Sequence, residues 1–345
     1  MKNSLRQFFL LGLICPFLFS CSSNTKIELN KDKLILKPQD SFKFEINNIK
    51  GEVNLSCTID GIVEIDNQNV SVTALKEGRT TFIASENTNN TAKCEIVVRH
   101  DHIEPTNAIN IATIAHKGYH VDEIENTLGA FSAAGRRNFY GIETDIYLTK
   151  DKYWVCNHDP KIKGMTKNIS DSTLDEILEV NLSNDPNKIV RICRFEDYIN
   201  VCSAYNKHPV IEFKEDENIT YLEQLISLLK NYNVINECIF ISKISSVLGN
   251  MYNLREKYHY SYDLQMLTEG TGWQYVPEIL NVSSQYDGIN AAMIEDCKFV
   301  GQYVAAWTVN EKEVAENLIT LGVKYITTDI FECSDQFVDN NLFGI

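Results

Sequence analysis

From about residue 107 onward, strand-like and helix-like patterns alternate, and this alternation constrains the fold more than any other feature of the sequence. Strands are expected at 111–115, 141–147, 153–157, 209–213, 237–242, 259–264, 287–290, 303–308 and 324–327. Helices are expected at 127–138, 220–232 and 311–321. Such alternation predicts a (β/α)8 TIM-type barrel of class α/β. The set holds one strand more than a barrel needs. Because the gap between 147 and 153 is too short for a crossover helix, we expect a hairpin there.

Residues 26–100 have a different texture, with short strand-type runs separated by turn signals such as Asp60-Gly61 and Glu77-Gly78. Several short strands at this spacing predict a small all-β sandwich in front of the barrel. The stretch GIVEIDNQNVSVTALKEGRTTFIAS resembles the bacterial Ig-like domains of cell-surface proteins. We find no charged pocket or catalytic constellation in this module, so we expect a spacer. A carbohydrate-facing module is the alternative.

The first residues are expected to be a targeting segment rather than part of the fold. Lys2 and Arg6 precede a short apolar run from Phe8 to Phe19, and a small residue stands before Cys21. This resembles a bacterial lipoprotein signal, in which cleavage precedes the cysteine and the cysteine is lipidated. We therefore expect a signal peptide at 1–20, a lipidated linker at 21–25 and an exported chain anchored to a bacterial membrane, periplasmic or at the cell surface. An ordinary signal peptide or an uncleaved anchor is the alternative.

Cysteine usage and net charge exclude some classes of protein. The chain has 10 cysteines, and they show neither CxxC nor Cys/His ligand spacing, so no zinc site is expected. An exported chain can form disulfides, and Cys57 with Cys94 is the best candidate pair in the N-terminal module. The formal net charge of −15 disfavours a nucleic-acid partner, because nucleic-acid binders carry a basic surface that neutralises phosphates.

Residues that carry chemistry end or follow the expected barrel strands. An i, i+2 spacing directs two side chains of a strand to one face, and the carboxyl ends of parallel barrel strands surround one site. Charges inside a barrel are costly to bury without a metal or a partner. Each cluster also has a purely structural explanation, such as a surface histidine or a solvated acidic pair. The clusters are His116 and Lys117, Glu143 and Asp145, His158 and Asp159, and Glu212 and Lys214.

Several separated motifs occur in a fixed order: AHKG, ENTLGAF, GIETDIYLTKDKYWVCNHDP, HPVIEFK, WTVN and GVKYITTD. Together they resemble the glycerophosphodiester phosphodiesterase family over about 107–332. The resemblance implies a barrel domain over 107–345 and metal-dependent hydrolysis of glycerophosphodiesters, small-molecule substrates, to glycerol 3-phosphate and an alcohol.

The resemblance also implies roles for individual residues. The family's acid/base pair corresponds to His116 and His158. Its ligands for a divalent cation, Ca²⁺ or Mg²⁺, correspond to Glu143, Asp145 and Glu212. Lys214 and Lys117 correspond to phosphate contacts, and Trp307 to an aromatic wall on the glycerol side.

The sequence departs from the family pattern at two places. Lys117 stands where the family usually has Arg, so a point charge replaces a fork that can hold phosphate oxygens bidentately. Residues 151–152 are Asp-Lys in place of the family's Asp-Gly. Residues 125–127 (Glu-Asn-Thr) keep the family motif, and a role as a helix cap explains them equally well.

The residue types agree with phosphodiester hydrolysis. Carboxylate oxygens favour Ca²⁺ or Mg²⁺ over zinc, and imidazoles titrate near neutrality, where proton transfer is most effective. Two alternatives stand beside this hypothesis. One is a related barrel phosphodiesterase that acts on phospholipids like a phospholipase. The other is a non-catalytic surface-binding lipoprotein in which the barrel is a scaffold.

Overall fold

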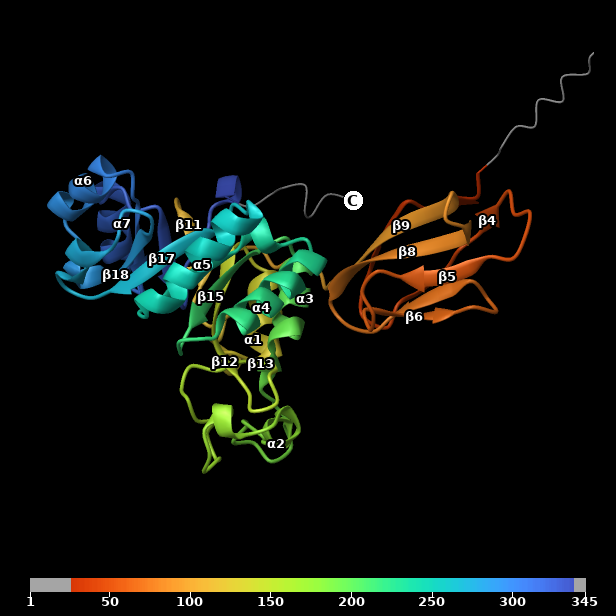
Figure 1. Ribbon diagram of the computed structural model, residues 1–345, viewed down its shortest axis with the longest axis horizontal. Coiled ribbons are helices and arrows are strands. Elements are labelled where there is room, and N and C mark those ends of the chain that lie inside the picture. Colours follow the sequence, from red (N-terminus) through yellow and green to blue (C-terminus); the bar gives the residue numbers. More distant parts are fainter. Residues whose placement is uncertain (1–25, 338–345) are drawn as a thin grey trace, which may run out of the picture.

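The computed structural model describes residues 26–337 of the 345-residue chain. The expected signal peptide, the linker at 21–25 and Cys21 lie outside the described residues. The N-terminal β-domain lies at one end of the molecule and the barrel at the other (Figure 1). Among residues 26–337, no helix is both long enough and apolar enough to span a bilayer.

The N-terminal domain is a small β-sandwich, as the sequence predicts. Its sheets have the strand orders β2-β9-β8-β5 and β3-β7-β6, and a short β1–β4 pair lies beside them. Phe44 stacks on Phe82 at 4.3 Å within the core that the sheets share. The strands are β1 (Glu28–Leu29), β2 (Lys33–Leu36), β3 (Ser41–Lys43), β4 (Ile46–Asn47), β5 (Asn54–Cys57), β6 (Val63–Asp66), β7 (Ser71–Ala74), β8 (Gly78–Asn87) and β9 (Asn90–Val98).

Cys57 and Cys94, the best candidate pair for a disulfide, are not bonded to each other. Both thiols are free. Phe82 of β8 pairs with Cys57 of β5 on one side and with Cys94 of β9 on the other, so a whole strand separates the two cysteines. Two strand spacings amount to about 9–10 Å, which exceeds the Cα separation that a disulfide can bridge.

Eight parallel strands form a closed barrel, which confirms the predicted fold class. β11 pairs with both β12 and β20, and these pairings close the ring. The extra strand of the prediction is β13 (Trp154–Cys156), which forms the expected antiparallel hairpin with β12, and β14 (Cys193–Arg194) extends it. The barrel strands are β11 (Ala112–Ala115), β12 (Gly141–Leu148), β15 (His208–Phe213), β16 (Ile239–Ser242), β17 (Asp263–Thr268), β18 (Asn281–Gln285), β19 (Val304–Trp307) and β20 (Tyr325–Thr328).

Helices cover the outside of the barrel, and α2 lies in a segment between β13 and β14 that projects from it (Figure 1). A short parallel pair, β10 (Ala108–Ile109) with β21 (Glu332–Cys333), joins the two ends of the barrel sequence. The helices are α1 (Leu128–Gly135), α2 (Leu174–Leu178), α3 (Phe195–Ala204), α4 (Ile219–Asn231), α5 (Ser245–Tyr258), α6 (Ala291–Phe299) and α7 (Lys312–Leu321). The 3-10 turns are η1 (Ile169–Asp171), η2 (Ile235–Glu237), η3 (Gly272–Tyr275), η4 (Tyr286–Gly288) and η5 (Asp335–Phe337).

Two barrel strands lie elsewhere than predicted. The strand expected at 287–290 is β18 at Asn281–Gln285, and Tyr286–Gly288 is a 3-10 turn. The strand expected at 259–264 is β17 at Asp263–Thr268. The aromatic residues before β17 favour a strand that begins too early, and the polar residues within β18 do not favour a strand at all. Packing in the barrel overrides these local propensities.

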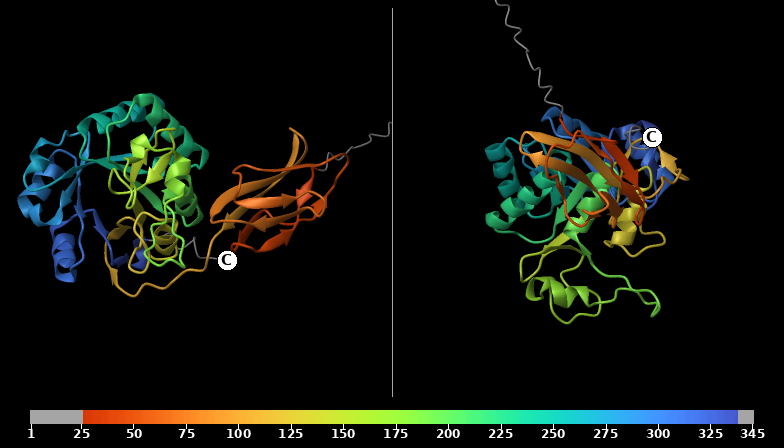
Figure 2. Two further views of the ribbon diagram at one scale, coloured as in Figure 1. Left: turned by 90° about the horizontal axis from the view of Figure 1, so that it is seen from below. Right: turned by 90° about the vertical axis from the view of Figure 1, so that its right-hand side faces the viewer.

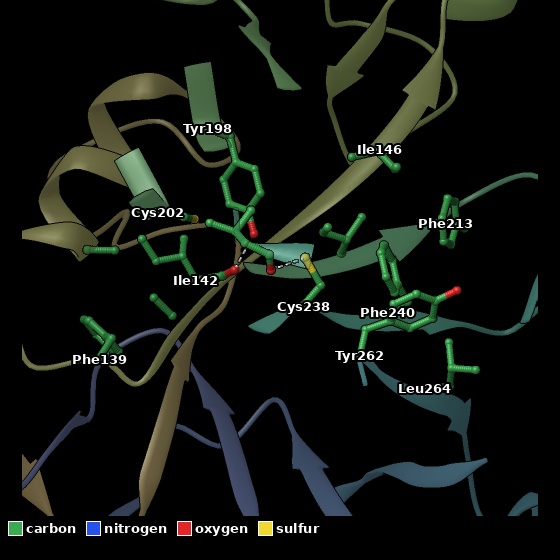
Figure 3. Close-up of a cluster of buried hydrophobic side chains, with 14 of the residues drawn as sticks. Phe139, Ile142, Ile146, Tyr198, Cys202, Phe213, Cys238, Phe240, Tyr262 and Leu264 are labelled. Carbon is green, nitrogen blue, oxygen red and sulfur yellow. Dashed lines mark hydrogen bonds between the residues drawn. The ribbon is translucent and has the colours of Figure 1, made fainter. Parts of the chain in front are cut away.

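Alternation along the strands separates the core from the site. Ile142 and Ile146 of β12 point outward into an apolar cluster with Phe213, Phe240 and Tyr198 (Figure 3). The Tyr198 hydroxyl on α3 donates to the backbone oxygen of Ile142 at 2.7 Å and fixes the helix against the strand. Since successive side chains alternate, Glu143 and Asp145 face the barrel interior, whereas Thr144 lies on the same face as the two isoleucines.

The β-sandwich is docked on the outside of the barrel at α1 and α3. The buried Glu77 carboxylate accepts hydrogen bonds from the Tyr205 hydroxyl (2.5 Å) and the Ser132 hydroxyl (2.9 Å). Lys76 pairs with Asp197 on α3 at 2.7 Å. The left view of Figure 2 shows the two domains beside each other. These contacts join the domains by side chains as well as by the connecting chain.

Candidate active site

A cavity of about 240 Å³ lies at the carboxyl ends of the barrel strands. Its wall contains residues from all eight strands or from the positions directly after them. The residues singled out from the sequence meet there: His116, Lys117, Glu143, Asp145, His158, Glu212, Lys214 and Trp307. Sequence reasoning did not single out the other lining residues, which are Ile241, Lys243, Leu267, Ser283, Thr308 and Thr327.

Three carboxylates form the floor of this cavity. Glu143 and Asp145 are 2% and 1% exposed, and the side chain of Glu212 is 14% exposed. One oxygen from each lies within 4.8 Å of the others. β12 pairs with β15 so that Asp145 stands opposite Glu212, which explains why two strands bring these acids together.

Crowding shifts the protonation of these acids. Burial, followed by the charges of Asp145 and Glu212, raises the pKa of Glu143 well above its usual range. Burial and the Asp145 charge raise the pKa of Glu212 to about 7, although Lys214 opposes the shift. Without a further positive charge, the cluster therefore holds protons that isolated carboxyls release.

Lys214 lies against two of the three acids. Its Nζ is 2.8 Å from Glu212 Oε1 and 3.3 Å from Asp145 Oδ1. Burial by itself lowers the pKa of Lys214, but the two carboxylates outweigh it and raise the pKa above the usual range. The ammonium group therefore stays charged, and three carboxylates with one ammonium leave a negative excess that matches a divalent cation.

The turn after β11 binds the third acid through its backbone. The Lys117 N–H donates to Glu143 Oε2 at 2.7 Å, and the Lys117 side chain lies 3.3 Å from the Glu125 carboxylate. Lys117 and Gly118 both have positive φ, 54° and 79°. A Cβ at Gly118 would lie 2.7 Å from the backbone carbon of Ala130, so the turn requires glycine there.

His116 follows β11 and is held by a residue at the end of the neighbouring strand β20. Its ring atom Nδ1 lies 2.8 Å from Asp329 Oδ1, and its backbone N–H donates to the backbone oxygen of Thr328 at 3.0 Å. Burial raises the pKa of Asp329, but hydrogen bonds with His116 and His120 outweigh it and hold the pKa well below its usual range. Asp329 is therefore an anionic partner that orients the His116 ring.

His158 reaches the cavity from the hairpin rather than from a barrel strand. It follows β13, and its Nδ1 lies 2.9 Å from Asp159 Oδ1. The side chain is 46% exposed, compared with 26% for His116. The two histidines thus stand in different environments, one half-enclosed and one close to solvent.

The sequence left open whether residues 125–127 support the site or cap a helix. Thr127 caps the helix, and Asn126 supports the site. Thr127 is the N-cap of α1, and its hydroxyl accepts from the Ala130 N–H. Asn126 is buried and holds Asp145 instead, with its Nδ2 donating to Asp145 Oδ2 at 2.9 Å. The Thr144 hydroxyl donates to Asn126 Oδ1 at 2.8 Å, which fixes the amide orientation.

An aromatic wall stands across the cavity. The Trp307 indole N–H donates to the Ser283 oxygen at 2.9 Å, which fixes the ring. The Lys243 ammonium lies 5.5 Å from the ring centroid and pairs with Glu269.

Sequence reasoning missed Asn126 and Asp329 as supports of the site. Both stand in motifs that it recognised, ENTLGAF and GVKYITTD, but their partners lie 19 and 213 residues away. An acidic residue directly after the last barrel strand was the available signal for Asp329, since that strand pairs with the one that carries His116.

Comparison with known proteins matches residues 116–332 to the family described as "Glycerophosphoryl diester phosphodiesterase family". The chain belongs to this family. It is therefore an enzyme of the phosphodiesterase class. The matched residues run from His116, directly after β11, to the start of β21, and they include every cavity residue named above.

Relatives agree with the family over the barrel. A glycerophosphodiester phosphodiesterase of Caldanaerobacter subterraneus subsp. tengcongensis is 29% identical over 241 residues, which is 63% of this chain and 93% of the relative. A human lysophospholipase D is 30% identical over 131 residues, which is 35% of this chain and 41% of the relative.

Solved structures share the fold of the barrel. A glycerophosphodiester phosphodiesterase of Parabacteroides distasonis has a TM-score of 0.56 at 24% identity, covering 64% of this chain and 94% of its own. An Oleispira antarctica phosphodiesterase, solved with its product sn-glycerol-3-phosphate, has a TM-score of 0.57 at 21% identity. It covers 64% of this chain and 93% of its own.

The turn at residues 151–152, where the sequence departs from the family pattern, has a left-handed backbone at Lys152. Lys152, at the place of the family's Gly, has a φ of 71°, and its N–H donates to the Thr149 oxygen at 3.0 Å. Its ammonium lies 4.9 Å from the Tyr221 ring centroid. A lysine thus adopts this left-handed conformation while its side chain packs on an aromatic ring.

Proposed function

We propose that this chain hydrolyses glycerophosphodiesters to glycerol 3-phosphate and an alcohol, with His116 and His158 as the acid/base pair. One observation carries the proposal: the two histidines line the same cavity as the buried acids and Lys214. Family membership and the glycerol-3-phosphate complex of the Oleispira antarctica enzyme support it.

A divalent cation fits the donor set of the cavity. Glu143, Asp145 and Glu212 offer oxygen ligands close together, and Lys214 compensates only part of their charge. Oxygen-only donors favour Ca²⁺ or Mg²⁺. When bound, such a cation supplies positive charge for the phosphoryl oxygens. Asn126 and the Lys117 N–H hold two of the ligands in place.

The two histidines supply the proton transfers. With Nδ1 engaged by Asp329 in His116 and by Asp159 in His158, the Nε2 atom of each ring is left for the substrate. One imidazole accepts the proton of the nucleophile, either water or the glycerol hydroxyl of the substrate, while the other protonates the leaving alcohol oxygen. If the glycerol hydroxyl attacks, the product is a cyclic phosphate, and a water molecule then opens the ring to give glycerol 3-phosphate. Each transfer contributes about 10²–10⁴-fold to the rate.

The remaining cavity residues bind the substrate. We assign Lys214 and Lys117 to the phosphate as point charges, since both line the cavity and the Lys214 ammonium borders the carboxylate cluster. Trp307 forms a rigid apolar wall for the carbon skeleton of glycerol, because its indole N–H is already bonded to Ser283.

The lipid anchor and the identity of the N-terminal domain belong to the same proposal. Residues 1–20 are a lipoprotein signal and Cys21 the lipidated residue, so the enzyme is exported and held at a bacterial membrane. The sandwich is an Ig-like spacer between the anchor and the barrel. Its location at one end of the molecule and its docking on α1 and α3 support a fixed spacing (Figure 1).

A phospholipase-type activity on membrane lipids is the second candidate, and the match to a human lysophospholipase D favours it. The two are separated by assaying glycerophosphocholine, glycerophosphoethanolamine and glycerophosphoglycerol against lysophospholipids, with and without chelator. We expect chelator-sensitive release of glycerol 3-phosphate from the water-soluble diesters. Turnover of lysophospholipids alone assigns the second activity, and no turnover of either class by folded protein overturns both and leaves the non-catalytic alternative.

A further inference from the structure

Two histidines share one carboxylate oxygen beside the cavity. His116 Nδ1 lies 2.8 Å and His120 Nε2 lies 3.1 Å from the same atom, Asp329 Oδ1. The other oxygen, Oδ2, accepts from Asn310 Nδ2 at 2.5 Å. Both oxygens of Asp329 are therefore engaged, and the two imidazoles compete for one of them.

The fold places this group through a tight turn and a strand pairing. β11 pairs with β20 in the register Ala115 to Thr328, which brings the next residues, His116 and Asp329, together. Positive φ at Lys117 and Gly118 then reverses the chain, so His120 returns to the same carboxylate. The conformation of the turn thus determines the position of His120 beside Asp329.

The surroundings of His120 favour its charged form. The hydrogen bond with Asp329 raises the pKa of His120 above its usual value, against the opposing effect of burial. The charged and titratable groups that face it are Asp329, Glu125, Lys117 and His116, whose ring centroid is 6.3 Å from that of His120. Its side chain is 24% exposed, so solvent screens these interactions only in part.

We propose that His120 is a positioning residue that shares Asp329 with His116 and thereby sets the pH range in which His116 transfers protons. A protonated His120 takes part of the anionic charge of Asp329 and repels a second proton on His116. Removing its charge leaves Asp329 to His116 alone, and His116 then holds its proton to higher pH. This inference rests on the proposed role of His116 in catalysis.

The size and direction of the effect follow from the geometry. Two unit charges at the 6.3 Å separation of the rings, in a partly solvated site, shift a titration by about 0.5–1 pH unit. If His116 is the base, the acid limb of the kcat/KM profile moves to higher pH. If it is the acid, the alkaline limb moves in the same direction.

The test compares His120→Gln, which keeps a hydrogen-bond donor without a charge, with wild type. His120→Ser is a second variant that lacks the reach of the ring. His259→Asn is the matched control, because His259 is exposed, ends α5 and has a φ of 58° that asparagine tolerates. The readouts are the NMR titration of the His116 Cε1–H in the full chain and the pH profile of kcat/KM on a glycerophosphodiester.

We expect the His116 titration midpoint and one limb of the profile to rise by about 0.5–1 pH unit in both His120 variants and to stay unchanged in His259→Asn. An unchanged or lowered midpoint in the His120 variants overturns the inference, as does an equal shift in the control. If wild type turns over no glycerophosphodiester, the proposed function fails, while the NMR midpoint still decides whether His120 acts on His116.

Discussion

Asn126 holds Asp145 in the orientation that the carboxylate cluster needs: its Nδ2 donates to Asp145 Oδ2 at 2.9 Å from a buried position with a φ of 55°. The bond leaves Asp145 Oδ1 facing Lys214 at 3.3 Å. An amide that binds one carboxylate oxygen fixes the direction of the other, which is how residues behind a metal site orient its ligands.

Replacing Asn126 with glycine keeps the left-handed backbone and removes this bond. We expect Asn126→Gly to weaken divalent-cation binding and kcat/KM by about 10–100-fold. Calorimetric titration with Ca²⁺ or Mg²⁺ and steady-state kinetics measure the two effects. Asn233→Gly is the matched control, since Asn233 is exposed and has a φ of 57°. Equal losses in both variants contradict the role assigned to Asn126.

The glycine after Lys117 is a steric requirement of the catalytic turn. A Cβ at Gly118 meets the backbone of Ala130 at 2.7 Å, whereas Gly164, with a φ of 93°, has nothing within 4 Å of its Cβ position. We expect Gly118→Ala to lower the free energy of unfolding by about 2–4 kcal/mol and Gly164→Ala by about 1 kcal/mol. Urea denaturation monitored by circular dichroism measures both, and similar losses contradict the steric explanation.

The acids of the cluster link cation binding to pH. The pKa values of Glu143 and Glu212 are raised, the latter to about 7, so the folded chain without a cation keeps protons that the unfolded chain releases above about pH 4.5. Stability of that form therefore falls as pH rises from about 4.5 to 7. We expect Ca²⁺ or Mg²⁺ to raise the melting temperature more at pH 7.5 than at pH 5.

Thermal denaturation at the two pH values, with cation and with chelator, measures this linkage. Glu212→Gln is expected to reduce the pH dependence of the cation effect. Glu316→Gln, on an exposed carboxylate whose side chain is 62% accessible, is expected to leave it unchanged. A cation effect as large at pH 5 as at pH 7.5 contradicts the assignment of these acids as ligands.

Lys117 is predicted to bind phosphate as a single charge. We expect Lys117→Gln to lower kcat/KM by about 10–100-fold through the loss of one charge-assisted bond, and Lys117→Arg to stay within about 3-fold of wild type. Kinetics on glycerophosphoglycerol measure both, with Lys312→Gln on the exposed side of α7 as control. Near-wild-type turnover of Lys117→Gln removes Lys117 from the phosphate contacts.

The sequence predicts the barrel and part of the cavity lining, including the three clustered acids, because these signals are local. The buried strand β11 is recognisable as a short apolar run. In β12, the i, i+2 spacing of Glu143 and Asp145 follows directly from strand geometry. The hairpin at β13 is likewise predicted from the length of a connection that is too short for a helix.

The features that sequence analysis did not predict depend on contacts between segments that are distant in the sequence. β18 reads as Asn-Val-Ser-Ser-Gln and becomes a strand because β17 and β19 flank it. The separation of Cys57 from Cys94 depends on strand order, which places β8 between them. The bond between His116 and Asp329 joins the first and last barrel strands, so it exists only once the barrel closes.

The most direct test of the proposed function is the rate of glycerol 3-phosphate release from glycerophosphocholine by wild type, His116→Ala and His158→Ala, each with Ca²⁺ or Mg²⁺. If the two imidazoles transfer the protons of the reaction, each variant loses about 10²–10⁴-fold in kcat. Circular dichroism of each variant establishes that the fold is retained. Turnover close to wild type in either folded variant contradicts the assignment of these histidines as the acid/base pair.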